Sequence, residues 1–341
     1  MAQFVPPTVT DAGDVSSFVI SLDFELHWGV CDRDNALTEY RSNLLNTRRV
    51  IPRLLDLFEE FDVRATWATV GFLFCESKAE LREHLPDERP QYANRRLSAY
   101  EYLDLVGDNE EDDPLHFAPS LIEKIADTDG QELASHTLSH YYCLEKGQTT
   151  EAFEADIEQA VRLARRRGVE LKSLVFPRNQ LNPRYLPILK RHGFHTYRGT
   201  PPAWMYEPRP GSDENLAHRG LRLLDAYLPL TDPTTENSSD VMVEDQTPIN
   251  VAANRFLRPY FPSLRRLEEI RLRRIKNEMA EAARNQAAYH LWWHPHNFGA
   301  HIEENFDFLR RILDYQHLLD RQYGMPSMTM SEAAHSQVAV A

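Results

Sequence analysis

The amino-acid sequence predicts an α/β fold built on a parallel sheet or barrel. Short apolar runs alternate with longer segments in which apolar residues recur every three or four positions, and this strand-then-helix unit is repeated four times. The run from Val63 to Phe74 lacks polar alternation, as expected of a strand covered on both faces. Polar side chains gather where the strands end, which is where α/β barrels place their active sites.

The first two hundred residues contain the repeated units. The expected strands are Phe18–Trp28, Val63–Phe74, Gln131–His136, Ser173–Asn179 and Phe194–Gly199. The expected helices are Leu44–Phe61, Ala118–Ala126, Thr150–Arg167 and Pro183–His192. Gly168 directly follows one of these helices, in the position where glycine commonly ends a helix.

The rhythm breaks after the fifth strand. Residues 200–254 are rich in Pro, Gly, Asp, Asn and Ser, and are predicted to form a long insertion that could cover a site, with one strand at Leu221–Leu228. The units then resume with a helix at Pro262–Gln286, a strand at Ala287–Trp293 and a helix at Glu303–Tyr323. The predicted organisation is a flexible arm over residues 1–16, one barrel domain over residues 17–325 that contains the insertion, and a tail over residues 326–341.

Composition excludes several classes of protein. The chain is 42% hydrophobic and 26% charged, which is ordinary for a globular protein. Its formal net charge of -14 argues against binding to nucleic acid or to anionic membrane surfaces. No apolar run reaches the length that a membrane span needs, and no signal peptide is visible. The three cysteines are widely spaced, which predicts neither a disulfide framework nor a thiolate zinc site. A cytoplasmic location is therefore expected.

The first strand ends in an unusual set of polar residues. Ser21, Asp23, Glu25 and His27 would share one face of this strand, because side chains alternate along an extended chain. Two carboxylates and an imidazole on one face are costly to bury without partners. A metal, a catalytic role or a salt-bridge network is needed to account for them.

Other strand ends add complementary groups. His136 and His140 have an i, i+4 spacing that suits two imidazoles on one divalent ion, although such a pair alone is more often structural. Arg178 ends the fourth strand, and His294 and His296 follow the last apolar strand. Two histidines and one carboxylate form the ligand set expected of catalytic zinc and of related divalent sites.

These residues occur within four ordered motifs. The motifs are SLDFELHWG at Ser21–Gly29, SHTLSH at Ser135–His140, FPRNQ at Phe176–Gln180 and HLWWHP at His290–Pro295. In order and spacing they resemble the motifs of the polysaccharide deacetylase family, also called the NodB-homology family or carbohydrate esterase family 4. The resemblance extends from about residue 16 to residue 298.

The resemblance implies a distorted (β/α)7 barrel that hydrolyses N-acetyl or related amide groups with one divalent metal. Zinc is the first expectation, with cobalt, manganese, nickel or iron as alternatives. The resemblance implies the following roles: general base for Asp23, metal ligands for Glu25, His136 and His140, orientation of the base for Arg178, and general acid for His294.

Two further residues are expected at the substrate-binding surface. They are Trp28 and His296, although a large aromatic residue near a barrel rim is at least as often part of the core. His294 is preferred over His296 as the acid, because Pro295 interrupts the strand between them.

The sequence departs from the familiar pattern in two places. An Asp-x-Glu spacing replaces adjacent aspartates, and the aromatic residue usual shortly after the third-motif arginine is absent. Three functions therefore stay open: an N-acetyl sugar deacetylase, a hydrolase of a small cyclic amide or ureide resembling allantoinase, and a non-catalytic carbohydrate-binding relative. The expected partner is an N-acetylated sugar or another small amide, and the sequence leaves homo-oligomerisation open.

Overall fold

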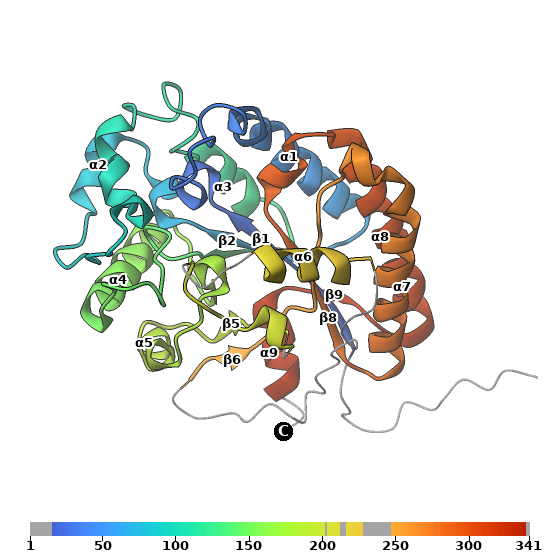
Figure 1. The fold of residues 1–341 in the computed structure, drawn as a ribbon. Helices are drawn as coiled ribbons and strands as arrows, with labels where there is room; N and C mark the ends of the chain where they lie inside the picture. Colours follow the sequence, from blue (N-terminus) through green and yellow to red (C-terminus); the bar gives the residue numbers. More distant parts are fainter. Residues whose placement is uncertain (1–15, 202, 212–215, 228–246, 339–341) are drawn as a thin grey trace, which may run out of the picture.

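The computed structural model describes residues 16–201, 203–211, 216–227 and 247–338, and its centre is one curled, fully parallel sheet (Figure 1). The path of hydrogen-bonded strands runs β6 (Ile249–Asn250), β5 (Thr196–Arg198), β4 (Ser173–Val175), β3 (Gln131–Ser135), β2 (Ala65–Thr69), β1 (Ser17–Phe24), β8 (Ala288–Trp293) and β7 (Arg255–Phe256). The sheet forms a half-barrel, which confirms the predicted α/β barrel-type fold. β1 lies near the middle of this path.

Helices surround the sheet (Figure 1). They are α1 (Arg41–Glu60), α2 (Lys78–Glu83), α3 (Pro119–Ala126), α4 (Thr150–Arg166), α5 (Leu186–Arg191), α6 (Leu216–Asp225), α7 (Glu268–Arg284), α8 (Ile302–Tyr323) and α9 (Met330–Val338). Three short 3-10 helices follow the strand ends near the site: η1 (Leu26–Gly29), η5 (Pro177–Asn179) and η11 (Pro295–Gly299). Most predicted helices are therefore present, with ends displaced by a few residues.

The strand register brings the predicted functional residues to one edge. Asp23 of β1 lies opposite Ala68 of β2, and the next residue of β2, Thr69, lies opposite Ser135 at the end of β3. On the other side of β1, Leu22 lies opposite Trp293, the last residue of β8. Asp23, His136 and His294 therefore lie at the carboxyl ends of three neighbouring strands.

The two faces of β1 contribute to different clusters. Phe18, Ile20, Leu22 and Phe24 face outward into the main core, where they pack with the buried faces of α1 and α8. Val19 faces inward, in a small cluster within the half-barrel. The remaining inward positions, Ser21 and Asp23, are polar, so the interior changes from apolar to polar toward the carboxyl edge.

The C-terminal residues form part of this interior. Residues 326–341 were expected to be a tail, but β9 (Ser327–Met328) pairs in parallel with β1, and α9 follows it. Met330, Ala333 and Ala334 are buried against Val19 and the inner faces of the neighbouring strands. The prediction is wrong for residues 327–338, because two-residue strands and a nine-residue helix give almost no periodicity in a sequence.

The insertion differs from its prediction in one element. The segment expected as a strand at Leu221–Leu228 is the end of helix α6, at least as far as Asp225. A short apolar run in a sequence can form either a strand or one face of a helix, and in this segment it forms a helix. Part of the insertion (residues 202, 212–215 and 228–246) and the expected arm over residues 1–15 lie outside the described residues.

The sequence composition also led to expectations about disulfide bonds and membrane spans. All three cysteines are free and buried, so the predicted lack of a disulfide framework holds. Within the described residues, no helix combines the length and apolarity required to cross a bilayer.

We predict that Met330→Ala lowers the free energy of unfolding by about 2 to 5 kcal/mol, because it removes a fully buried side chain from the interior. Leu318→Ala is the control, since Leu318 on α8 is 44% exposed and its loss should cost less than about 0.5 kcal/mol. Urea denaturation measures both. Equal effects of the two substitutions would contradict the burial of α9.

Candidate functional site

A cavity of about 780 Å³ opens at the carboxyl edge of the sheet. Its lining contains five of the predicted functional side chains: Asp23, Glu25, His140, Arg178 and His294. Trp292 of β8 also lines the cavity. This location agrees with the general position of active sites in parallel α/β barrels.

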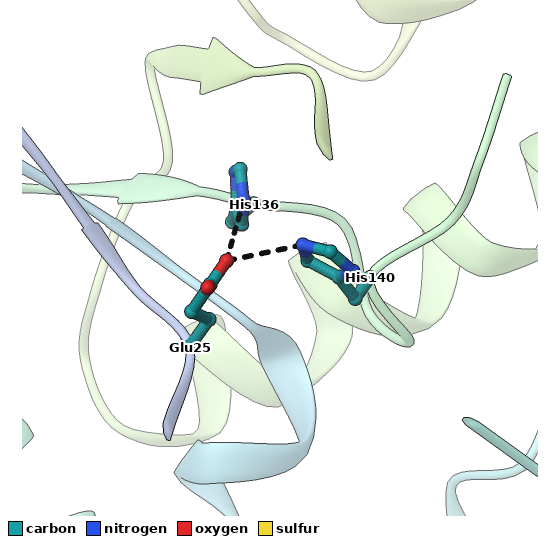
Figure 2. A group of neighbouring side chains, drawn as sticks. All are labelled: Glu25, His136 and His140. Carbon is teal, nitrogen blue, oxygen red and sulfur yellow. Dashed lines mark ion pairs between the residues drawn. The ribbon is translucent and has the colours of Figure 1, made fainter. Parts of the chain in front are cut away.

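Glu25, His136 and His140 form a compact, buried group (Figure 2). Glu25 Oε2 lies 3.5 Å from His136 Nε2 and 3.1 Å from His140 Nε2. The three potential ligand atoms lie within 4.8 Å of one another. His140 has a positive φ of 59°, which a residue with a side chain seldom adopts, and this conformation belongs to the turn that brings both rings to Glu25. The structure therefore assembles the predicted ligand set from two distant segments.

The surroundings of the two rings favour metal ligation. His136 Nδ1 lies 2.9 Å from the carbonyl oxygen of Val175, to which it donates, so Nε2 presents its lone pair toward Glu25. His140 Nδ1 lies 3.1 Å from the hydroxyl of Tyr142. Burial lowers the pKa of His140 to about 4, which keeps this ring neutral. Two imidazole nitrogens and one carboxylate at this spacing fit a small divalent cation.

Asp156 of α4 holds the loop that carries His140. Its carboxylate accepts hydrogen bonds from the backbone N–H of Leu138 at 2.6 Å and of Ser139 at 3.2 Å, and from the Ser139 hydroxyl at 2.5 Å. Asp156 is fully buried, and this burial raises its pKa to about 6. Asp156 was not among the site residues predicted from the sequence. The sequence signal for its role is that an acidic residue stands among the apolar positions of the amphipathic helix α4.

We predict that Asp156 makes stability depend on pH. Its folded-state pKa of about 6 exceeds the ordinary value of 3.8, so the folded state retains a proton that the unfolded chain releases between these values. The stability contributed by this group is present below about pH 4 and is lost as the pH rises through about 6.

The measurement compares wild type with Asp156→Asn by denaturation at a series of pH values. The difference in unfolding free energy, wild type minus variant, should fall by roughly 3 kcal/mol from pH 4 to pH 7. Parallel pH profiles for the two proteins would show that Asp156 does not titrate in this range.

Asp23 is held by a buried arginine. Arg198, the last residue of β5, donates to both carboxylate oxygens of Asp23, at 2.6 and 2.8 Å. The same guanidinium donates to Ser21 Oγ at 3.0 Å and to Asn179 Oδ1 at 3.2 Å, and lies 4.1 Å from the centre of the Trp292 ring. Burial alone would raise the pKa of Asp23, but the charge of Arg198 lowers it, so this carboxylate stays ionised.

Arg178 does not make the predicted contact with Asp23. It forms an ion pair with Asp32 at 2.7 Å, and its guanidinium lies 4.5 Å from the centre of the Tyr142 ring. The 3-10 turn η5 explains the difference, since Arg178 and Asn179 both have a φ of 53° and only Asn179 reaches the Asp23–Arg198 pair. The assignment of Arg178 as the residue that orients Asp23 is therefore corrected to Arg198. The position of Arg198 at a strand end could have indicated this.

We predict that Arg198→Met lowers the free energy of unfolding by about 3 to 5 kcal/mol, because it leaves the buried Asp23 charge without a partner. Arg178→Met is the matched control and should cost about 1 kcal/mol or less, since the Arg178–Asp32 pair is partly exposed. Chemical denaturation at neutral pH compares the two variants. A larger loss for Arg178→Met would contradict this assignment.

His294 and His296 occupy different environments. His294 Nε2 lies 3.7 Å from Asp23 Oδ2 and 3.6 Å from Glu25 Oε1, and its partly exposed side chain lines the cavity. His296 is buried, with Nε2 3.9 Å from Glu25 Oε1, and it stacks against His294 with ring centres 5.0 Å apart. Burial lowers the pKa of His296 to about 3. His294 therefore faces the cavity, whereas the predicted substrate contact by His296 is not supported.

Trp28 is part of the core. Its side chain is fully buried, its indole N–H donates to the carbonyl oxygen of His116 at 3.0 Å, and its ring packs on Phe72. The prediction that Trp28 binds substrate is wrong, because η1 turns this residue away from the cavity edge. Trp292 is the tryptophan that lines the cavity.

His27 joins a buried polar chain instead of the metal-ligand group. His27 Nδ1 lies 2.8 Å from His116 Nε2, and His116 Nδ1 lies 2.6 Å from Asp113 Oδ2. These contacts connect η1 to the loop before α3. They account for a polar group that the sequence left without a role.

The parallel half-barrel and the two-histidine, one-carboxylate group place this protein among α/β proteins with a candidate divalent metal site at the carboxyl edge of the sheet. The sequence model described as Polysaccharide deacetylase matches residues 40–197. Residues 40–197 are therefore similar to the polysaccharide deacetylase family. The matched region contains His136 and His140 but begins after Asp23 and Glu25. No curated protein matches this chain.

Solved structures share the fold at low sequence identity. A protein assigned as a polysaccharide deacetylase from Mycobacterium smegmatis superposes with a TM-score of 0.61 at 15% identity, covering 99% of this chain and 95% of that one. The PuuE allantoinase gives 0.53 at 13% identity, covering 96% and 91%. A 4-alpha-glucanotransferase from Thermococcus litoralis gives 0.51 at 12% identity, covering 94% of this chain and 40% of that one. These enzymes catalyse different reactions, so fold similarity alone does not identify the chemistry.

Proposed function

We propose that this protein is a divalent-metal-dependent hydrolase that removes an acetyl group from an N-acetylated sugar or polysaccharide precursor. One observation carries the proposal: the buried Glu25–His136–His140 group lies beside Asp23 and His294 at a cavity. The match of residues 40–197 to the polysaccharide deacetylase model supports the same reaction class. We propose a cytoplasmic location and zinc as the physiological metal.

Glu25, His136 and His140 would hold the metal. A divalent ion bound there would polarise the acetamide carbonyl and lower the pKa of water, the usual contributions of a metal to amide hydrolysis. Glu25 stands where the family pattern has an aspartate, as in an Asp-x-Glu variant. It directly precedes η1, and the start of this 3-10 helix fixes the position from which the longer Glu25 side chain extends.

Asp23 would act as the general base. It accepts the proton of the water molecule that attacks the acetamide carbon, and Arg198 keeps its carboxylate ionised and oriented. Because Arg198 donates to both oxygens, proton uptake by Asp23 weakens an existing ion pair. Loss of the proton by Asp23 restores this ion pair, so the carboxylate is readily regenerated.

His294 would act as the general acid. The side-chain amide of Asn297 lies 3.3 Å from His294 Nδ1, and Nε2 points toward the two carboxylates. A protonated His294 at this position gives its proton to the departing amine, which would otherwise be too basic a leaving group.

We predict that metal binding and turnover can be separated by mutation. Asp23→Asn and His294→Gln should retain the metal but lower acetate release by a factor of about 100 or more. His136→Ala and His140→Ala should lose both, because each removes a ligand. Elemental analysis and an acetate assay measure the two properties.

His317→Ala is the control, since His317 is exposed on α8 and should change neither property. Near-full activity of Asp23→Asn would contradict the role of Asp23. A wild-type protein without a stoichiometric divalent metal would contradict the proposed function itself.

A second candidate function is the hydrolysis of a small cyclic amide or ureide. The Asp-x-Glu spacing and the fold shared with the PuuE allantoinase favour it. A panel of N-acetyl sugars, glycan oligomers and cyclic ureides distinguishes the two substrate classes. Metal binding without hydrolysis of any compound would favour a non-catalytic carbohydrate-binding protein.

A further inference from the structure

Arginines are concentrated around the cavity, although the protein as a whole is acidic. Six of the described residues that line it are arginines: Arg33, Arg178, Arg209, Arg222, Arg255 and Arg258. The carboxylates in the same lining are Asp23, Glu25 and Glu207. In a chain with a formal net charge of -14, this reversal of sign is local to the cavity.

Three of these arginines have ion pairs among the described residues, and one of them is Arg209, which lies 3.9 Å from Glu207. Arg178 is paired with Asp32 at 2.7 Å, and Arg255 is paired with Glu278 at 2.5 Å. The cavity carboxylates are also engaged, since Asp23 is held by Arg198 and Glu25 lies against the two histidines of the candidate metal site. Few carboxylates of the lining are therefore available to balance the charges of Arg33 and Arg258.

Arg258 and Arg33 have no carboxylate partner within the part of the chain that the structure describes. Arg258 follows β7 and is half-buried, whereas Arg33 lies in the exposed loop after η1. Burial lowers the pKa of Arg258, and the nearby charges of Arg222 and Arg271 lower it further. A half-buried guanidinium among like charges is costly unless an anion binds it.

We propose that the substrate of this site carries an anionic oxygen group, a phosphate or a carboxylate, in addition to its N-acyl group, and that Arg258 and Arg33 bind this anion. Guanidinium groups suit this task, because their planar arrangement of donors matches the oxygens of both anions. The cavity volume of about 780 Å³ can hold a sugar with such a substituent. The inference rests on the proposed function for the N-acyl part of the substrate.

The test measures binding by calorimetry to the full-length, metal-loaded protein. The probes are N-acetylglucosamine, N-acetylglucosamine 1-phosphate and N-acetylmuramic acid, so that a neutral sugar is compared with a phosphate and a carboxylate. At least one charged probe should bind about tenfold or more tightly than the neutral sugar. Tighter binding of only one charged probe identifies the anion that the site selects.

The variants are Arg258→Gln and Arg33→Gln, with Arg284→Gln as a matched control. Arg284 is exposed at the end of α7, and its replacement removes the same charge away from the cavity. Arg258→Gln and Arg33→Gln should each weaken the preferred charged probe about tenfold and change the neutral sugar less than twofold. Circular dichroism checks folding, and the exposed Arg33 provides a second variant if Arg258→Gln unfolds.

Binding is repeated after removal of the metal with a chelator, to separate the arginines from the metal site. An arginine-dependent preference for the charged probe should persist. Equal binding of charged and neutral probes, no binding of any charged probe, or loss of the preference with the metal would overturn the inference.

Acetate release distinguishes this inference from the proposed function. Release from neutral and charged sugars at equal rates, with no effect of Arg258→Gln, would overturn the inference and leave the deacetylase proposal intact. Arginine-dependent binding of a charged probe without hydrolysis of any amide would support the anion site and contradict the deacetylase.

Discussion

The buried pair of Asp23 and Arg198 is the interaction on which the rest of the site depends. A carboxylate inside a half-barrel is stable only if its charge is balanced, and Arg198 does this with two hydrogen bonds. The same guanidinium contacts Ser21 of β1, Asn179 of η5 and Trp292 of β8, so two further segments, η5 and β8, are positioned around the pair. Asp23 therefore remains available to the cavity while its partner stays buried.

The sequence predicted the part of the fold that depends on strand order. Parallel strands end at one edge, so Asp23, His136 and His294 could be expected to converge without any knowledge of side-chain contacts. It did not predict which arginine reaches Asp23. Arg198 ends β5, whereas Arg178 lies in η5 after β4. The left-handed conformation of Arg178 directs it to Asp32, and this conformation leaves no periodic signal in the sequence.

The remaining differences between the sequence-based predictions and the structure arise where long-range packing decides the position of a residue and the local sequence pattern does not. Trp28 has the same parity as the outward residues of β1, and after η1 its ring still packs in the main core, so an expected binding residue is a packing residue. Asp156 was overlooked because its role depends on a loop eighteen residues earlier in the chain. The C-terminal helix was missed because its burial depends on strands that precede it by well over a hundred residues.

The position of α9 also bears on how the protein folds during synthesis. Met330 donates its backbone N–H to the Thr66 hydroxyl, a contact between residues 264 positions apart, and β9 pairs with β1 across an even longer separation. The interior of the half-barrel cannot be completed until residues 327–338 have left the ribosome. Contacts of such long range slow folding, and the apolar inner faces of the strands stay uncovered until α9 has been made.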